Sequence, residues 1–221
     1  MSRPDAIEAI VFDMDGVLID SERTWEAARK ALVVQSGRPY PPDATRAIMG
    51  MSAPEWARYL RHDLGVDLPE AQIQGAVVAR VAHDLREHLD LMPGAVACVR
   101  TLAARWPLAI ASSANHALIE LVLELSGLRD AFRAVVGAEE VARGKPAPDV
   151  YLRACELLGA DPHRSVSVED SSNGIRSGHA AGMRVVAIPN RDFPPAPDAL
   201  ALADTILSDL SELTPERLSG E

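Results

Sequence analysis

The chain has 221 residues, 48% of them hydrophobic and 24% charged, and its formal net charge is -10 at pH 7. This is enough chain for one domain with a large insertion or for two modest domains. The acidic balance argues against nucleic acid or an anionic membrane as a partner, because no positive field would offset phosphate repulsion. The first apolar run is too short for membrane spanning or export. We expect a cytoplasmic protein that is a monomer or a weak homo-oligomer.

Short apolar runs rich in β-branched residues predict five buried strands in chain order. They cover residues 9–12, 108–111, 134–136, 166–168 and 185–188, and segments with helical spacing lie between them. Near-continuous apolar strands that alternate with helices are typical of a parallel sheet covered on both faces. The predicted fold class is therefore α/β, with a doubly wound, Rossmann-like parallel sheet.

The interval between the first two strands is too long for an ordinary crossover. It spans about 95 residues, whereas a strand–helix–strand unit needs about 30. Residues 20–90 show helical patterns, such as apolar residues at four-residue steps from Ile73 to Leu85, and no clear buried strand. We interpret residues 20–90 as a helical cap domain inserted into a core domain of residues 1–19 and 91–221. A connection of this length is expected to form a lid over the strand ends.

Polar side chains follow the predicted strands at their carboxyl ends, where open parallel sheets bind ligands. Each of these residues alone could be a turn residue, a helix cap or a surface charge. Their occurrence at four separate strand ends is the stronger signal. They are Asp13 and Asp15 after the first strand, Ser112, Ser113 and Asn115 after the second, Lys145 near the third, and Glu169 and Asp170 after the fourth.

The acids in this set predict a metal site. Converging carboxylates repel one another unless a cation lies among them, and oxygen ligands select a hard ion such as Mg²⁺. We expect Asp13 and Asp170 to be side-chain ligands, with Glu169 close by or bound through water.

The remaining groups predict phosphoryl chemistry. Lys145 is one of only two lysines in the chain, and together with the Ser112 hydroxyl and nearby backbone N–H groups it could bind a phosphoryl group. An ionised Asp13 could then attack phosphorus. Asp15 could protonate the leaving oxygen and later deprotonate water, provided that a closing lid removes water from its carboxyl group.

Four motifs in order carry a resemblance to a known family: "DMDGVLIDSE", the serine of "IASSAN", the lysine of "GKPAPD", and "VEDSSNG". With them the sequence resembles the haloacid dehalogenase-like (HAD) superfamily, in the branch of phosphatases and phosphomutases that carry a helical cap. The resemblance implies an aspartyl-phosphate mechanism with Mg²⁺ as cofactor. It assigns Asp13 as nucleophile, Asp15 as acid/base and backbone ligand of Mg²⁺, Ser112, Ser113 and Lys145 as phosphate binders, and Glu169 and Asp170 as metal-binding acids.

The resemblance also separates branches of the superfamily. Dehalogenases and phosphonate-cleaving members lack the second acid, so Asp15 argues against both. β-Phosphoglucomutases usually carry a histidine where this chain has Trp25, and an arginine in the cap loop where "GMSAPEW" has none. We therefore favour a phosphatase that hydrolyses a small phosphomonoester, of the sugar phosphate or phosphoglycolate type. A sugar phosphomutase is the alternative, and a non-catalytic phospho-acceptor domain is a third reading.

Substrate choice is predicted to depend on the cap, in the loop at residues 46–52. Arg46 could meet a second polar group of the substrate or could be a solvated helix residue, while the methionines and Trp25 could line a pocket or pack the cap. The expected partner is a small phosphorylated metabolite, with no nucleic acid and no membrane. The candidate substrate-binding residues are Trp25, Arg46, Met49, Gly50, Met51 and Asn115.

Overall fold

The computed structural model describes residues 6–48, 51–190 and 193–219, and the chain divides into two compact units. The first unit combines Met1–Asp20 with Leu91–Glu221, and the second is Ser21–Asp90. In the first unit, Ile19 and Leu91 form an isolated antiparallel bridge, so the chain leaves and re-enters this unit at adjacent points. The backbone N–H of Met92 also donates to the Leu18 carbonyl at 2.9 Å.

The first unit is built on one six-stranded sheet in which all neighbouring strands are parallel. This confirms the predicted α/β class and doubly wound sheet. The order across the sheet is β3-β2-β1-β4-β5-β6. The strands are β1 (Ala9–Phe12), β2 (Leu108–Ala111), β3 (Phe132–Val136), β4 (Ser165–Glu169), β5 (Arg184–Ala187) and β6 (Thr205–Ile206).

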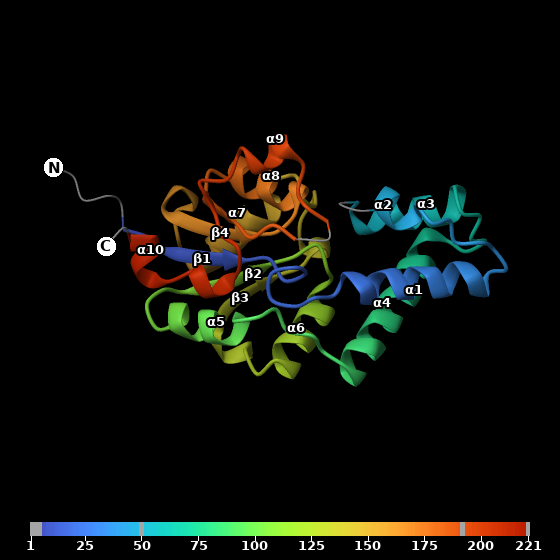
Figure 1. Ribbon diagram of the computed structural model, residues 1–221, viewed down its shortest axis with the longest axis horizontal. Coiled ribbons are helices and arrows are strands. Elements are labelled where there is room, and N and C mark those ends of the chain that lie inside the picture. Colours follow the sequence, from blue (N-terminus) through green and yellow to red (C-terminus); the bar gives the residue numbers. More distant parts are fainter. Residues whose placement is uncertain (1–5, 49–50, 191–192, 220–221) are drawn as a thin grey trace. The chain divides into compact units, whose positions relative to one another are not determined.

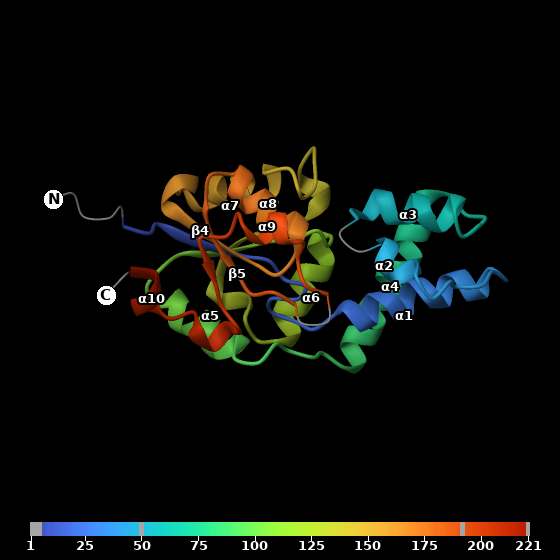
Figure 2. The same cartoon turned by 45° about the horizontal axis from the view of Figure 1, so that its top comes forward.

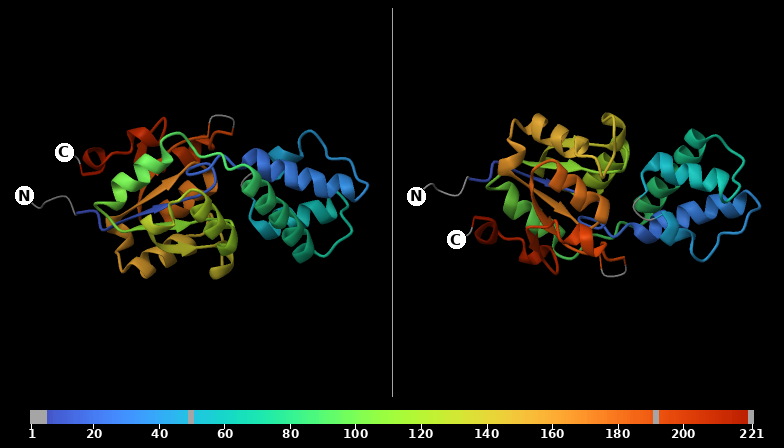
Figure 3. Two further views of the ribbon diagram at one scale, coloured as in Figure 1. Left: turned by 90° about the horizontal axis from the view of Figure 1, so that it is seen from below. Right: turned by 90° about the horizontal axis from the view of Figure 1, so that it is seen from above.

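Helices cover both faces of this sheet, which explains why β1 and β2 are apolar and buried on both sides. In Figure 1, α5 (Ala95–Ala103) and α6 (His116–Leu125) lie on one face, and α7 (Asp149–Leu158) and α8 (Ser172–Ala180) lie on the other. Figure 3 views the molecule from these two opposite sides. Every residue of β1 is buried, as expected for a strand in the middle of a covered parallel sheet.

The core beneath α7 is made of side chains that alternate along the strands. Val11 of β1 points to this face, while the next residue, Phe12, meets Phe132 of β3 edge-on with ring centroids 6.0 Å apart. The α7 residues that complete the core include a fully buried tyrosine. The cluster contains Val11, Ala109, Ala111, Ala134, Val136, Val150, Tyr151, Ala154, Cys155, Ala181 and Met183.

The direction of chain progression reverses between β1 and β4. The chain runs outward from β1 through β2 to β3, and then returns to place β4, β5 and β6 on the other side. Phe12 is in register with Val168, and the backbone N–H of Asp13 donates to the Val168 carbonyl at 3.0 Å. Such a reversal leaves a crevice at the carboxyl ends of the two strands. The residues that follow β1 and β4 are therefore neighbours there.

Short elements complete the first unit. None of the described helices is long and apolar enough to cross a membrane. The remaining elements are η1 (Arg129–Ala131), η2 (Ala138–Glu140), η3 (Pro162–Arg164), α9 (Pro197–Leu200), η4 (Leu210–Glu212) and α10 (Pro215–Ser219).

The second unit is helical throughout its regular structure. Its helices are α1 (Glu22–Gln35), α2 (Ala44–Ile48), α3 (Ala53–His62) and α4 (Glu70–Glu87) (Figure 2). The four-residue apolar pattern of α4 forms one buried stripe, made by Ile73, Val77, Val81 and Leu85. This helix packs against α1 and α3. The unit therefore has a core of its own.

Candidate active site

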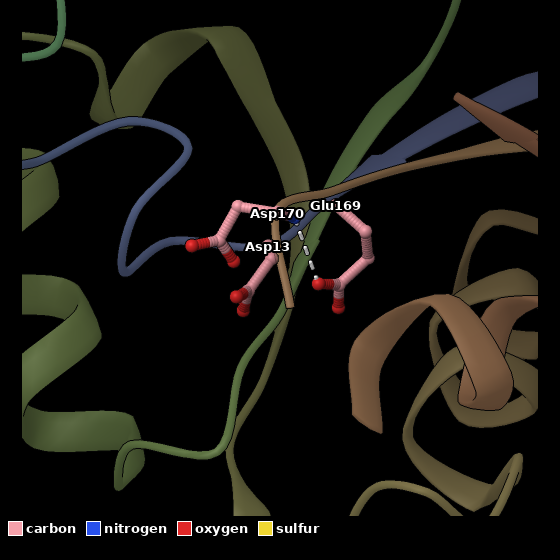
Figure 4. A group of neighbouring side chains, drawn as sticks. All are labelled: Asp13, Glu169 and Asp170. Atoms are coloured by element: carbon pink, nitrogen blue, oxygen red, sulfur yellow. Dashed lines mark hydrogen bonds between the residues drawn. The ribbon is translucent and has the colours of Figure 1, made fainter. Parts of the chain in front are cut away.

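Three carboxylates meet at the carboxyl ends of β1 and β4. Asp13 directly follows β1, Glu169 is the last residue of β4, and Asp170 follows it. Carboxylate oxygens of all three lie within 4.8 Å of one another, and all three side chains are buried. In the view of Figure 4 the Asp13 carboxylate lies between those of Glu169 and Asp170. The strand reversal thus brings together acids that are more than 150 residues apart in sequence.

Lys145 joins this cluster from the loop between η2 and α7. Its Nζ lies 2.9 Å from Asp13 Oδ1 and 2.5 Å from Glu169 Oε1, and its side chain is buried. Burial alone would lower the pKa of the ammonium, but the charges of Asp13 and Glu169 raise it above its usual value. Lys145 therefore stays charged inside the protein.

Glu169 has protein donors on both carboxylate oxygens and no exposure to solvent. Oε1 accepts from Lys145 and also from the hydroxyl of Tyr151, at 2.7 Å. Oε2 accepts from the backbone N–H of Asp170 at 3.2 Å, drawn in Figure 4, and from the Ser171 hydroxyl at 3.3 Å. The carboxylate is thus held in one orientation.

Sequence reasoning did not identify Tyr151 as a residue of the site. Burial of this residue and the Glu169 and Asp13 charges raise the pKa of its hydroxyl well above the usual value. No signal in the sequence separates this tyrosine from an ordinary core residue of a helix, so its polar contact could not be predicted.

The cluster carries more negative charge than the protein itself balances. Burial raises the pKa of Asp13 to about 7; Lys145 opposes this shift, while the charges of Glu169 and Asp15 add to it. Burial also raises the pKa of Asp170 well above its usual value, with Glu169 and Asp13 adding to the shift. Oxygen-only donors that are desolvated and short of positive charge fit a hard divalent cation such as Mg²⁺.

Two glycines make room for the acids. Gly16, at φ 78°, approaches Asp170 so closely that an added β-carbon would overlap the carboxylate. Gly174, in the first turn of α8, lies in the same way against the Glu169 carboxylate. A side chain at either position would force the carboxylate that it meets to shift.

The segment after β2 places one predicted phosphate binder inside the protein and one on its surface. Ser112 is buried and its Oγ accepts from the Ala114 backbone N–H at 3.0 Å, whereas Ser113 is exposed. Neither serine caps α6. The N-cap is Asn115, whose Oδ1 accepts from the Leu118 N–H at 3.2 Å, so this oxygen of the candidate substrate-binding residue has a structural partner.

Asp15 lies two residues beyond Asp13 and is partly exposed. It forms an isolated bridge with Ile19 within the turn that follows β1. Its charge acts on the pKa of Asp13, so the two carboxylates are electrostatic neighbours. Its carboxylate is not among the oxygens that cluster within 4.8 Å in the described residues.

The candidate cap residues belong to the second unit. The rings of Trp25 and Trp56 are tilted against each other with centroids 6.5 Å apart. Arg46 is exposed, and Met51 is half-buried. Met49 and Gly50 lie outside the described residues.

Comparison with known proteins places this arrangement in a family. A family model described as haloacid dehalogenase-like hydrolase matches residues 7–182, which include all four motifs. The chain belongs to this family. The predicted resemblance is confirmed, and the chain is a HAD-superfamily phosphatase of the β-phosphoglucomutase-like branch, a phosphoric monoester hydrolase.

Individual relatives are similar over nearly their whole length. Hexitol phosphatase B of Escherichia coli K12 is 35% identical over 226 residues, with 100% of both chains covered. Fructose-1-phosphate phosphatase of the same organism is 32% identical over 186 residues, covering 81% of this chain and 95% of that protein. The crystal structure of CbbY from Rhodobacter sphaeroides with phosphate has a TM-score of 0.84 and 31% identity, covering 94% of this chain and 96% of its own. A mutant of that CbbY was solved with xylulose-1,5-bisphosphate.

Proposed function

We propose that this HAD phosphatase hydrolyses a small phosphorylated sugar or a related metabolite, such as phosphoglycolate, through an aspartyl-phosphate on Asp13 and with Mg²⁺ as cofactor. The observation that carries the proposal is the buried cluster of Asp13, Glu169 and Asp170 with Lys145 against two of its members. A desolvated nucleophile beside an ammonium is suited to a substrate that brings its own negative charge.

In the first half of the reaction an Asp13 oxygen attacks phosphorus and the ester P–O bond breaks. Asp15 gives its proton to the departing oxygen, so that the alcohol leaves neutral. In the second half Asp15 takes a proton from water, and the resulting hydroxide attacks the phosphoryl group. The bond from phosphorus to Asp13 then breaks, which restores the carboxylate and releases inorganic phosphate. Two residues thus divide nucleophilic and acid/base work.

Lys145 and Ser112 are proposed to bind the oxygens of the transferring phosphoryl group. The Lys145 ammonium donates to Glu169 Oε1 and lies 2.9 Å from Asp13 Oδ1, and because an ammonium has three donors, one is left for a substrate oxygen. Ser112 lies at the carboxyl end of β2, next to β1 in the sheet. Its Oγ accepts from the Ala114 N–H, and the hydroxyl can at the same time donate its hydrogen to a phosphoryl oxygen.

Asp13 and Asp170 are the residues proposed to hold Mg²⁺, together with the backbone carbonyl of Asp15. When bound, the ion supplies positive charge that offsets both the acids and the phosphoryl oxygens. Burial and the neighbouring carboxylates raise the pKa values of Asp13 and Asp170, and the positive charge of the ion would offset this effect. Glu169 is proposed to contribute through its charge and through Lys145.

A sugar phosphate is the preferred substrate class, and residues 21–90 are proposed to act as a cap that selects it. Similar proteins include a hexitol phosphatase and a fructose-1-phosphate phosphatase. A separate helical unit with its own core can vary without disturbing the sheet that carries the acids. Trp25, Arg46 and the loop that contains Met51 are its proposed substrate contacts.

The test is phosphate release from a panel of hexitol, hexose, pentose and two-carbon phosphates, with Mg²⁺ and with a chelator. Wild type is compared with Asp13→Asn, which keeps the side-chain size and removes the nucleophile. We expect Mg²⁺-dependent release by wild type and a loss of about a thousandfold or more in the variant. Equal rates in the two proteins would refute the assigned nucleophile. Conversion of one hexose phosphate isomer into another without phosphate release would indicate a mutase.

A further inference from the structure

The phenol of Tyr151 touches the charged cluster from inside the protein. The residue is fully buried, in the first turn of α7, six residues after Lys145. Its hydroxyl donates to Glu169 Oε1 at 2.7 Å, and its ring lies under the Lys145 ammonium with Nζ 5.0 Å from the ring centroid. One side chain therefore contacts both members of a buried ion pair.

Tyr151 and Lys145 share a single acceptor atom. Glu169 Oε1 receives the ammonium at 2.5 Å and the phenol at 2.7 Å. Because this oxygen accepts two hydrogen bonds, its negative charge is shared between two donors. The oxygen therefore attracts the ammonium less strongly than it would if Lys145 were the single donor. The aromatic face below Nζ adds an attraction that does not use an N–H donor.

We propose that Tyr151 is a positioning residue of the phosphatase: through its hydroxyl it fixes Glu169 and so keeps the Lys145 ammonium placed between Asp13 and the incoming phosphoryl group. Without the phenol, Lys145 would be the one donor left to Glu169 Oε1 among the described residues. The ion pair would tighten, and the ammonium would be drawn from Asp13 and from substrate oxygen. This inference rests on the proposed role of Lys145 in phosphoryl binding.

The informative variant is Tyr151→Phe, which removes one oxygen and preserves the ring, the packing and the contact of the ring with Nζ. The expected result is a fall of about tenfold in kcat/KM, equal to about 1.4 kcal/mol, carried mainly by kcat. Inorganic phosphate and vanadate, measured as inhibitors and by calorimetry in the presence of Mg²⁺, are expected to bind several-fold more weakly. Binding is a readout that does not depend on turnover.

The matched control is Ser165→Ala, which removes another buried hydroxyl, from β4, the strand that ends at Glu169. Ser165 begins β4, at the end opposite Glu169, and its Oγ donates to the Asp161 carbonyl at 2.8 Å. We expect this variant to lose thermal stability while its kinetic constants and its affinity for vanadate stay at the wild-type values. This variant therefore measures how the loss of a buried hydroxyl affects the enzyme through its stability alone.

The outcomes separate this inference from the proposed function. An active wild type with unchanged kcat and unchanged vanadate affinity in Tyr151→Phe would overturn the positioning role while leaving the phosphatase proposal intact. A wild type without Mg²⁺-dependent phosphatase activity would overturn the proposed function. In that case the positioning role stands only if Tyr151→Phe still weakens phosphate binding, and it falls if binding is unchanged.

Discussion

Asp13 and Asp170 show what the fold does to an ordinary carboxyl group. In the unfolded chain both titrate near their usual value of 3.8, whereas in the folded protein burial raises the pKa of Asp13 to about 7 and that of Asp170 well above its usual value. Between these values the folded state retains a proton that the unfolded state has lost. Because of the Asp13 shift, the metal-free protein should lose stability as pH rises from about 4 to about 7, with the full Asp13 penalty above this window, and the raised pKa of Asp170 acts in the same direction.

This linkage predicts how Mg²⁺ acts on stability. Mg²⁺ binds the ionised acids, so it should raise the melting temperature more at about pH 8 than at about pH 5. Differential scanning fluorimetry with and without Mg²⁺ measures both shifts. Asp170→Asn is the control, since the metal-free variant should melt higher than wild type at about pH 8 and gain little from Mg²⁺. Equal shifts at the two pH values, or an undiminished shift in Asp170→Asn, would contradict the metal site.

The acids and the lysine of the site could be predicted from the sequence, but the hydrogen bonds that connect them could not. Asp13, Lys145 and Glu169 were identified because carboxylates and a rare lysine follow apolar strands. The contact from Tyr151 could not be predicted, because a tyrosine in a helical apolar pattern is ordinarily a core residue. Its hydroxyl contacts Glu169 because α7 packs against the sheet. Roles within the site remain predictions that kinetics must test.

The close packing of α8 against the last residue of β4 depends on a glycine in α8. An added β-carbon at Gly174 would overlap the Glu169 carboxylate, which is fixed from the other side by Lys145 and Tyr151. By contrast, Gly75 lies in α4 with nothing within 4 Å of the position a β-carbon would take. Two helical glycines thus occupy opposite environments.

The two glycines make a matched pair of substitutions. Gly174→Ala is expected to destabilise the protein by about 2 kcal/mol, because the carboxylate must shift, and to reduce phosphate release along with it. Gly75→Ala is expected to stabilise the protein by about 1 kcal/mol through helix propensity, with activity unchanged. Chemical denaturation of both variants beside wild type gives the measurement. A Gly174→Ala variant as stable and as active as wild type would show that Glu169 is not fixed as described.

The elements themselves were largely readable from the sequence. Five predicted strands lie where apolar runs occur, although β3 begins at Phe132, two residues earlier than expected. That extension includes Arg133, which is exposed near the sheet edge and interrupts the apolar run. Gly159 ends α7 in the left-handed region, at φ 66°. The strand order could not be predicted from a single sequence, because hydrophobic periodicity indicates which residues are buried and not which strands are neighbours in the sheet.

For the whole molecule, the division into two units separates chemistry from the proposed selection of substrate. All the clustered acids and Lys145 belong to the first unit, and Trp25 belongs to the second. Composition predicted the inserted helices because no apolar strand occurs for about 70 residues. Substrate preference leaves no comparable pattern, since it depends on the shape and polarity of a small number of side chains.

This division predicts a selective effect of Trp25→Ala. The ratio of kcat/KM between a hexitol phosphate and acetyl phosphate should change by about tenfold, because a pocket contact discriminates between large and small leaving groups. Val34→Ala is the control in the same helix, since Val34 is 55% exposed, and it should leave the ratio unchanged. If Trp25→Ala lowered both kcat/KM values by the same factor, Trp25 would not be a selective contact.

Asp13 itself is proposed to carry the phosphoryl group during turnover. The most direct measurement is acid quenching of the working enzyme with its best substrate and Mg²⁺, followed by borohydride reduction and peptide mass spectrometry. An acyl phosphate is reduced to an alcohol, so we expect homoserine at position 13 only when substrate and Mg²⁺ are both present, and none in the Asp13→Asn variant. Rapid phosphate release with an unmodified position 13, or homoserine at another acidic position, would contradict it.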